Sequence, residues 1–359
     1  MLIGLIRWLD KYIGGLKCLA FGLFPKRRFI QPKRILAIQL WGLGESTLTL
    51  PALYALKKRF PEAKIEVLAT KRNEEIYYKQ PFKLRVVALN PFSLLSFVLN
   101  NKYDLVVDFE EYLNSSALVA RMAGKHCIGF DTGVRKHALD NAIPYDDMKH
   151  TSETFFDLVR ALGVKGEVEK LVALKVSDAD DQAALRFMQE HKLNRFIGIA
   201  PGAAESSRQR IWPLDRFAKV ADSLDHPVVF FGGPDETGLI EDVRKQMKKE
   251  SFIAAGKLSL RQSFALVKRS KLFISNDSGL MHVAAAMDVP TIGLFGPNLP
   301  ERWRPYNKKS TAIYKGHECS PCINSHKGEF PKCKFNDDNK CMKKINVEEV
   351  VKAARKMLK

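Results

Sequence analysis

Short apolar runs alternate with longer amphipathic stretches from residue 33 to about residue 163, and the alternation begins again near residue 195. The apolar runs have the length of buried strands, and the stretches between them have helical spacing. Such an alternation predicts an open, mostly parallel sheet covered by helices. The strands are expected at 34–40, 64–70, 84–89, 103–109, 126–130, 195–202, 226–233, 251–255, 271–275 and 290–296.

The two rounds of alternation predict two α/β domains in tandem, which suits a chain of 359 residues. The boundary is expected near residue 170, so the domains comprise residues 31–170 and 171–359. In such sheets the carboxyl ends of the strands carry the ligand. We therefore expect the functional residues in the loops that follow the strands.

Residues 1–30 form a separate amphipathic segment. Arg7, Asp10, Lys11 and Lys17 interrupt its apolar residues, and no uncharged run approaches the ~20 residues that a spanning helix needs. The spacing of the charges predicts a helix that lies on an anionic membrane surface, with the basic sequence PKRR after it. The alternative is a helix packed on the protein's own core.

The formal net charge of +18 predicts an acidic partner, such as a nucleic acid, an anionic membrane or a phosphorylated substrate. The chain has no low-complexity basic tail and no nucleic-acid-binding motif, so the charge alone gives little support for a nucleic acid. Six cysteines in a chain of this length do not form a disulfide scaffold.

The first predicted strand is followed by a glycine-rich loop and a helix. Gly42 and Gly44 permit a tight turn, and Glu45 stands at the helix start. The loop is neither a P-loop nor a complete dinucleotide fingerprint. Glu45 either complements the helix dipole, a contribution of under about 1 kcal/mol, or acts as a general base.

Polar loops also follow the strands of the second domain. Ser206 and Arg210 offer a hydroxyl and a guanidinium group that suit a phosphate, although a solvated basic loop has the same composition. Glu236 follows the next Gly-Gly turn and could accept hydrogen bonds from a ribose. Its alternative role is that of an acid in the first turn of a helix.

The stretch NDSGLMHVAAAMDVPTIGLFGP, residues 276–297, carries the most specific polar residues. Asp277, Ser278 and Gly279 lie between a strand and a helix, where free backbone N–H groups and the helix dipole favour an anion. His282 follows within the first turn. A lone buried histidine is usually structural, but this position beside an anion site favours a functional role.

Four cysteines lie near the C-terminus, at Cys319, Cys322, Cys333 and Cys341. They are enough for a tetrahedral structural zinc site, although their spacing is not that of a standard zinc finger. Free buried thiols and disulfides are the alternatives.

Together these motifs resemble glycosyltransferase family 9, the lipopolysaccharide heptosyltransferases, over residues 33 to 345. The resemblance rests on GLGESTLTLPALYALKKRFP, PGAAESSRQRIWPLDRFA, FFGGPDE, the stretch 276–297 and the CSPC sequence. It implies a GT-B fold, in which two Rossmann-like domains face each other across a cleft. It also implies inverting transfer from an ADP-sugar to a glycolipid acceptor, without a catalytic metal or other cofactor.

The resemblance also implies roles for individual residues. Glu45 falls where the family has an aspartate base, and Arg210 falls where a lysine is common. Contacts to the donor are implied for Ser206, Ser278, Gly279 and Leu280 at the phosphates, Asp277 and His282 beside the sugar, Glu236 near the ribose and Leu258 near the adenine. Ala200 and Asn298 depart from the family pattern.

A lipopolysaccharide-core acceptor places the enzyme in the cytoplasm, peripherally on the inner face of the inner membrane. Two other functions remain open at this point. One is a nucleotide-sugar epimerase with the same fold, and the other is a basic zinc-containing nucleic-acid-binding protein.

Overall fold

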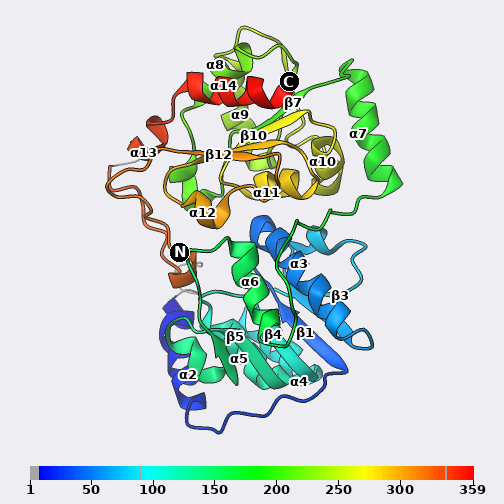
Figure 1. Cartoon of the computed structure of the whole chain (residues 1–359), viewed down its shortest axis with the longest axis vertical. Helices are drawn as coiled ribbons and strands as arrows, with labels where there is room; N and C mark the ends of the chain where they lie inside the picture. Colours follow the sequence, from blue (N-terminus) through cyan, green and yellow to red (C-terminus); the bar gives the residue numbers. More distant parts are fainter. Residues whose placement is uncertain (1–7, 89, 336–337) are drawn as a thin grey trace. The chain divides into compact units, whose positions relative to one another are not determined.

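A computed structural model describes residues 8–88, 90–335 and 338–359 of the chain. The chain divides into two compact units (Figure 1). Unit 1 comprises the residues up to Glu169 together with Asn324–Glu329, and unit 2 comprises Lys170–Ile323 and Phe330–Lys359. A short piece of the C-terminal region therefore belongs to unit 1.

Unit 1 is built on a six-stranded parallel sheet with the order β3-β2-β1-β4-β5-β6. Its strands are β1 (Arg34–Ile38), β2 (Lys64–Ala69), β3 (Lys83–Val86), β4 (Tyr103–Asp108), β5 (Gly124–Phe130) and β6 (Asn141–Ile143). Its helices are α2 (Gly15–Phe21), α3 (Leu43–Arg59), α4 (Pro91–Asn100), α5 (Asn114–Ala123) and α6 (Thr151–Arg160), with short turns η1 (Asp10–Gly14), η2 (Glu74–Tyr77), η3 (Gly133–Ala138) and η6 (Ser325–Lys327).

Unit 2 repeats the arrangement with the order β12-β11-β10-β7-β8-β9. Its strands are β7 (Ile197–Ala200), β8 (Val228–Phe230), β9 (Ser251–Ile253), β10 (Leu272–Asn276), β11 (Thr291–Phe295) and β12 (Thr311–Tyr314). Its helices are α7 (Asp178–Glu190), α8 (Leu214–Asp222), α9 (Thr237–Arg244), α10 (Leu260–Val267), α11 (Gly279–Ala286), α12 (Pro300–Trp303), α13 (Lys340–Lys343) and α14 (Val347–Leu358), with turns η4 (Glu205–Arg210) and η5 (Pro234–Glu236).

The central strands of both sheets are buried along their length, apart from the exposed Arg34 at the start of β1 and the half-buried Asp104 in β4. This burial explains why they read as continuous apolar runs, since helices cover both faces of such a sheet. The predicted α/β class with two parallel sheets is confirmed. The edge strands β6 and β12 are not among the predicted strands, because each is short and only half-buried over most of its length.

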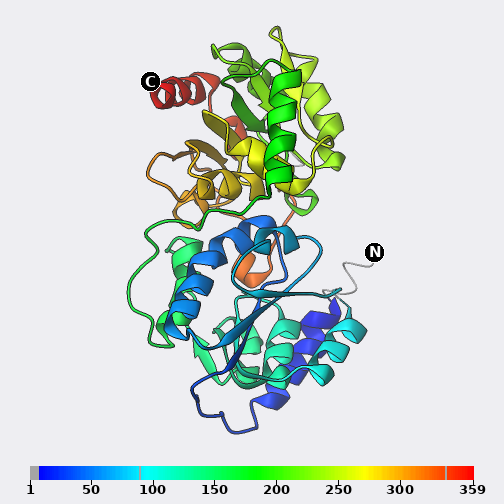
Figure 2. The same cartoon turned by 90° about the vertical axis from the view of Figure 1, so that its right-hand side faces the viewer.

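The N-terminal segment packs on unit 1 through one face. Gly14, Gly15 and Cys18 are buried, and the segment lies against α5 and η3. Figure 2 shows this dark-blue helix among the helices of unit 1. Asp10 accepts the backbone N–H groups of Asn114 and Ser115 at 3.1 and 2.7 Å, and so caps the start of α5.

Two residues of the basic sequence after this helix bind other residues of unit 1. Arg27 binds the buried Asp140 carboxylate at 2.8 Å, and Lys26 donates to the backbone oxygens of His137 and Leu139. Two of the basic side chains of PKRR thus bind unit 1, whereas Arg28 is exposed. Arg7 lies outside the described residues.

No helix in the described part of the chain is long and apolar enough to cross a membrane.

Candidate active site

Both sheets have the doubly wound order in which the first and fourth strands lie side by side. These strands are β1 and β4 in unit 1, and β7 and β10 in unit 2. The order in which successive strands are added to the sheet reverses between these two strands. Ligands of such sheets bind beyond the carboxyl ends of the strands at this point. Glu45 follows β1 in the first turn of α3, and Arg210 follows β7 in η4. Asp277 and His282 follow β10, in the loop and in the helix α11 after it.

Asn276 joins the two central loops of unit 2. It is the buried last residue of β10. Its side-chain amide donates to the backbone oxygens of Pro201 and Gly202 at 2.7 and 3.2 Å, and its oxygen accepts the N–H of Trp212 at 3.1 Å. Our sequence analysis did not select this residue. An asparagine at the end of an apolar strand is the signal that could have found it.

Arg210 and Asp277 meet across these loops. Arg210 Nη1 lies 3.4 Å from the Asp277 backbone oxygen and 3.5 Å from its carboxylate oxygen Oδ2. The Asn298 amide donates to the same carboxylate oxygen, so this departure from the family pattern fixes Asp277. The Nε of Arg210 is buried and has no partner in the described part of the chain. It is therefore a donor available to a bound anion.

The start of α11 faces the same loop. Ser278 is its N-cap residue and shares a hydrogen bond of 2.9 Å with Ser275. The first backbone N–H groups of a helix lack intrahelical acceptors, and the helix dipole makes this end attractive to negative charge. Ser278, Gly279 and Leu280 are only partly buried, which leaves this end accessible to an anion.

His282 is buried one turn further along α11. Its ring lies 6.1 Å from the Trp303 ring, centre to centre. Burial, together with the charge of Arg210, lowers the pKa of His282 to about 3, so the imidazole is neutral at neutral pH. Its Nδ1 has no partner among the described residues and can make one hydrogen bond.

Glu236 lies beside the loop that follows β7. Its carboxylate accepts the N–H of Gly233 at 2.8 Å, and a Cβ on Gly202 would come 1.7 Å from its Oε1. Burial raises the pKa of Glu236. It thus has a capping role in addition to its predicted contact with a ribose.

Ser206 and Leu258 are less closely tied to this group. Ser206 is exposed on η4, whereas its neighbour Ser207 is buried, and Leu258 is half-buried after β9. No hydrogen bond within the described residues joins either one to Arg210 or Asp277.

In unit 1, Glu45 lies in the first turn of α3. Gly42 precedes this helix with φ of +53°, and a Cβ there would come 2.0 Å from Oε2 of Glu45. Position 42 therefore requires a glycine, both because of its backbone conformation and because the carboxylate approaches closely. Gly44 is buried within the same turn.

A second carboxyl group, Glu110, lies after β4. It is 2% exposed and accepts the N–H of Leu40 at 2.5 Å and the amide of Gln39 at 3.3 Å. Burial raises the pKa of Glu110 well above its usual value, and the charge of Glu45 acts in the same direction. Sequence analysis missed Glu110, although two acids directly after an apolar strand were a usable signal.

The structure does not confirm the predicted zinc site. All four C-terminal cysteines are free thiols, and within the described ranges no three or more histidine, cysteine or acidic side chains are arranged to hold a metal. Cys341 is buried near Gly296. Cys319 lies 3.4 Å from the Nδ1 of His317.

Comparison with known proteins gives the family. The profile of glycosyltransferase family 9 (heptosyltransferase) matches residues 92–332. Lipooligosaccharide heptosyltransferase 2 of Campylobacter jejuni is 24% identical over 88% of this chain and 96% of its own length. Lipopolysaccharide heptosyltransferase 3 of Escherichia coli is 26% identical over 76% of this chain and 86% of its own.

Solved structures show the same fold. A glycosyltransferase family 9 protein of Veillonella parvula has a TM-score of 0.76 at 24% identity, covering 91% of this chain and 97% of its own. The ADP-heptose LPS heptosyltransferase II of E. coli has a TM-score of 0.70 at 22% identity, covering 90% and 98%. The family profile spans most of this chain, including the loops of β7 and β10, so the chain belongs to glycosyltransferase family 9, the heptosyltransferase family, and is a glycosyltransferase.

Proposed function

We propose that this enzyme transfers a heptose from ADP-heptose to the lipopolysaccharide core or a similar glycolipid, with inversion at the transferred carbon. The observation that carries the proposal is the cluster of Arg210, Asp277 and the first turn of α11 at the direction change of the second sheet. The names of the relatives support the sugar and the acceptor. Family membership favours transfer over an epimerase or a nucleic-acid-binding protein.

The proposed reaction forms one bond and breaks another. An acceptor hydroxyl oxygen attacks the sugar carbon, and the bond from that carbon to the ADP oxygen breaks, so ADP leaves with the electron pair. The departing phosphate gains negative charge, which Arg210 and the N–H groups of Gly279 and Leu280 are placed to stabilise. The proposal needs no metal cofactor, because these groups supply the positive charge.

The remaining groups have roles at the sugar and the hydroxyl. Asp277 and the neutral His282 hold the sugar through hydrogen bonds, and Glu236 holds the ribose. Glu45 of unit 1 takes the proton from the acceptor hydroxyl as general base. Residues 31–170 thus form the acceptor domain, and residues 171–359 form the donor domain.

Arg210→Ala is expected to weaken ADP binding by about 1.5–3 kcal/mol, because a charge-assisted hydrogen bond is lost. Calorimetric titration with ADP measures the effect. Arg208→Ala is the matched control, since Arg208 is exposed on the same turn and should bind ADP normally. Equal ADP affinity in both variants would show that Arg210 does not bind the donor.

We further propose that the exposed face of the N-terminal segment binds the anionic inner leaflet of the inner membrane from the cytoplasm. Leu16 is 70% exposed and Leu23 is 88% exposed. Lys11, Lys17 and Arg28 are also exposed along this segment. Apolar side chains flanked by basic ones are typical of helices that lie in a membrane interface.

Substitution of this face is a cleaner test than deletion, because deletion would remove the Asp10 cap and the Arg27–Asp140 ion pair. The double variant Leu16→Glu/Leu23→Glu is expected to lose more than about tenfold in affinity for anionic vesicles, since burial of a leucine contributes about 1.5–3 kcal/mol. Met148→Glu, at another exposed apolar residue, is the control. Vesicle sedimentation that is unchanged in the double variant would rule out this face.

A further inference from the structure

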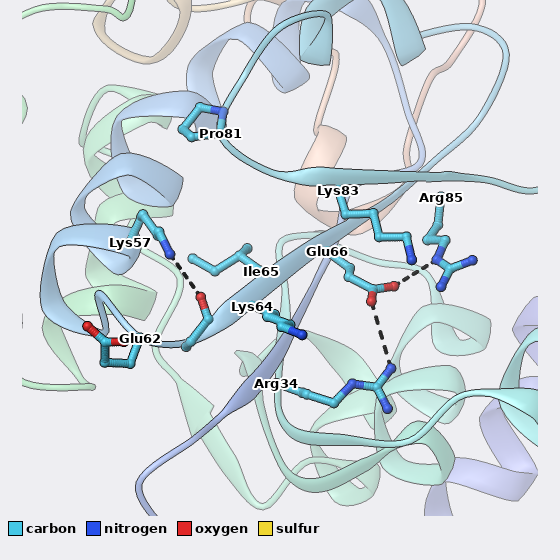
Figure 3. A pocket seen from close by; sticks show the side chains of 10 residues that line it. Arg34, Lys57, Glu62, Lys64, Ile65, Glu66, Pro81, Lys83 and Arg85 are labelled. Carbon is cyan, nitrogen blue, oxygen red and sulfur yellow. Dashed lines mark hydrogen bonds and ion pairs between the residues drawn. The ribbon is translucent and has the colours of Figure 1, made fainter.

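A cavity of about 630 Å³ opens at the amino ends of the first strands of unit 1 (Figure 3). We call it the amino-edge pocket. It lies at the amino ends of the strands, whereas Glu45 lies beyond the carboxyl end of β1. Its lining residues are Arg34, Lys57, Glu62, Ala63, Lys64, Ile65, Glu66, Pro81, Lys83 and Arg85.

The lining contains five basic and two acidic side chains. The acid at its centre, Glu66, is 5% exposed and bonds to Arg85 at 2.7 Å and the Tyr103 hydroxyl at 2.9 Å. Arg34 lies 3.7 Å from its other oxygen. Burial raises the pKa of Glu66, but these hydrogen bonds outweigh it and hold the pKa below its usual value. Glu66 is therefore charged, and its charge is shared by two arginines.

Within the described part of the chain, no carboxylate forms an ion pair with the lysines of the pocket. The charge of Lys83 acts on Glu66 without direct contact and helps to lower the pKa of Glu66. The side chains of Lys64 and Lys83 are exposed, and their ammonium groups form no hydrogen bond or ion pair within the described part of the chain. The ammonium group of Lys57 is held by the backbone oxygens of Pro61 and Ala63 at 2.7 and 3.0 Å. The Lys57 ammonium group has no carboxylate partner within the described part of the chain. The exposed Glu62 is the other acid of the lining.

The register of the strands fixes the spacing of these charges. Lys64 on β2 pairs with Arg34 on β1, and Glu66 on β2 pairs with Lys83 on β3. Paired residues on adjacent strands project from the same face of the sheet, and the strands are about 4.8 Å apart. Figure 3 shows Arg34, Lys64, Lys83 and Arg85 near Glu66, and Lys57 on the other side of Ile65. This arrangement suits an anion with several neighbouring charged groups rather than a single carboxylate.

We propose that the amino-edge pocket binds a ligand that carries neighbouring phosphate groups. Two sources share this chemistry, namely a soluble polyphosphate and the headgroup of a phosphorylated lipid. Lysines and arginines bind phosphate oxygens through charge-assisted hydrogen bonds, and the fixed donors of Lys57 and Arg85 lower the ordering cost. This inference does not depend on the proposed donor site, which lies in unit 2.

The test measures binding of inorganic tripolyphosphate to the full chain by calorimetry, with ADP at saturation to fill the donor site. Lys64→Gln/Lys83→Gln is expected to weaken binding about tenfold or more, because two contacts to phosphate are lost. Neither lysine has a partner whose loss would disturb the fold. Lys308→Gln/Lys352→Gln removes the same charge from exposed positions of unit 2 and is expected to bind normally.

A second arm identifies the source. Sedimentation with phosphatidylcholine vesicles, with and without phosphatidic acid, is measured for wild type and both double variants. A pocket that receives a lipid headgroup gives vesicle binding that needs Lys64 and Lys83 and is displaced by tripolyphosphate. A soluble ligand gives tripolyphosphate binding alone.

Two results would overturn the proposal. One is the absence of any tripolyphosphate or vesicle binding that needs Lys64 and Lys83, and the other is an equal loss in the two double variants, which would indicate attraction by net charge only. The failure of this proposal is distinguishable from failure of the donor site. Arg210→Ala leaves the amino-edge pocket intact, and Lys64→Gln/Lys83→Gln leaves ADP affinity intact.

Discussion

Glu45→Gln is expected to lower turnover by about 10²–10⁴-fold, the usual contribution of a general base. Glutamine keeps the shape of the side chain and removes the proton acceptor. The affinity for ADP should survive, because the proposed donor groups lie in unit 2. Turnover at saturating donor and the melting temperature are the two quantities to measure.

The competing role of Glu45 is structural, since its carboxylate folds over Gly42 at the start of α3. If this is its only role, Glu45→Gln lowers the melting temperature slightly and leaves turnover nearly intact. Glu153→Gln is the matched control, because Glu153 stands in the first turn of α6. It is expected to cost stability without a comparable loss of turnover. Near-normal turnover in Glu45→Gln would place the base elsewhere.

Glu110 bears on the same test. The raised pKa of this buried carboxyl group favours its protonated form, which limits the repulsion that it exerts on an ionised Glu45. The loop between β1 and α3 thus has a glycine turn at Gly42, and its residue Leu40 donates its N–H to the buried carboxyl group of Glu110.

The sequence predicted the two α/β sheets because their central strands are buried on both faces and read as unbroken apolar runs. The edge strands β6 and β12 escaped prediction for the opposite reason, since they are short and half-buried. Their position depends on pairing with a neighbour, which a local pattern does not record.

The N-terminal segment shows a second limit of local patterns. The spacing of Asp10 and the lysines predicted an amphipathic helix, and one face is indeed apolar and exposed. However, Asp10 and Arg27 bind residues about a hundred positions away, at Ser115 and Asp140. The alternative of a helix packed on the protein therefore holds for one face, whereas the other face is exposed and its binding to a membrane stays a prediction.

Some residues of the candidate site could be predicted from the sequence, and others could not. Asp277 and His282 lie close to a strand end and a glycine, and Arg210 lies in a polar loop after a strand, which made them visible in the sequence. Asn276 and Glu110 act by holding backbone groups of a neighbouring loop. Such contacts arise only when the sheet brings two distant loops together.

A large loss of stability is expected when the buried ion pair at the end of β4 is broken. Arg135 and Asp108 are both fully buried. Arg135 also donates to the backbone oxygens of Leu113 and Phe130 at 3.2 and 3.1 Å. Asp108 accepts the Ser116 hydroxyl at 2.8 Å, so the pair ties together β4, α5 and η3.

Arg135→Met is expected to destabilise the protein by about 3–5 kcal/mol, because it leaves the Asp108 carboxylate buried without its counterion. Chemical denaturation measures the loss. Lys136→Met is the control, since Lys136 forms a half-exposed ion pair with Asp131 and such pairs contribute about 0–1 kcal/mol. The double variant Arg135→Met/Asp108→Asn should recover part of the loss, because no charge remains buried.

The pH dependence gives this prediction a second readout. Burial raises the pKa of Asp108, and the charge of Arg135 opposes that rise. Without Arg135 the folded-state pKa rises further above the unfolded value, so the penalty is absent below the unfolded pKa and grows as the pH rises toward the folded pKa. Arg135→Met should therefore lose less stability, relative to wild type, at about pH 4 than at about pH 7. A loss that is the same at both pH values would mean that it comes from packing and the lost backbone hydrogen bonds rather than from the unpaired carboxylate.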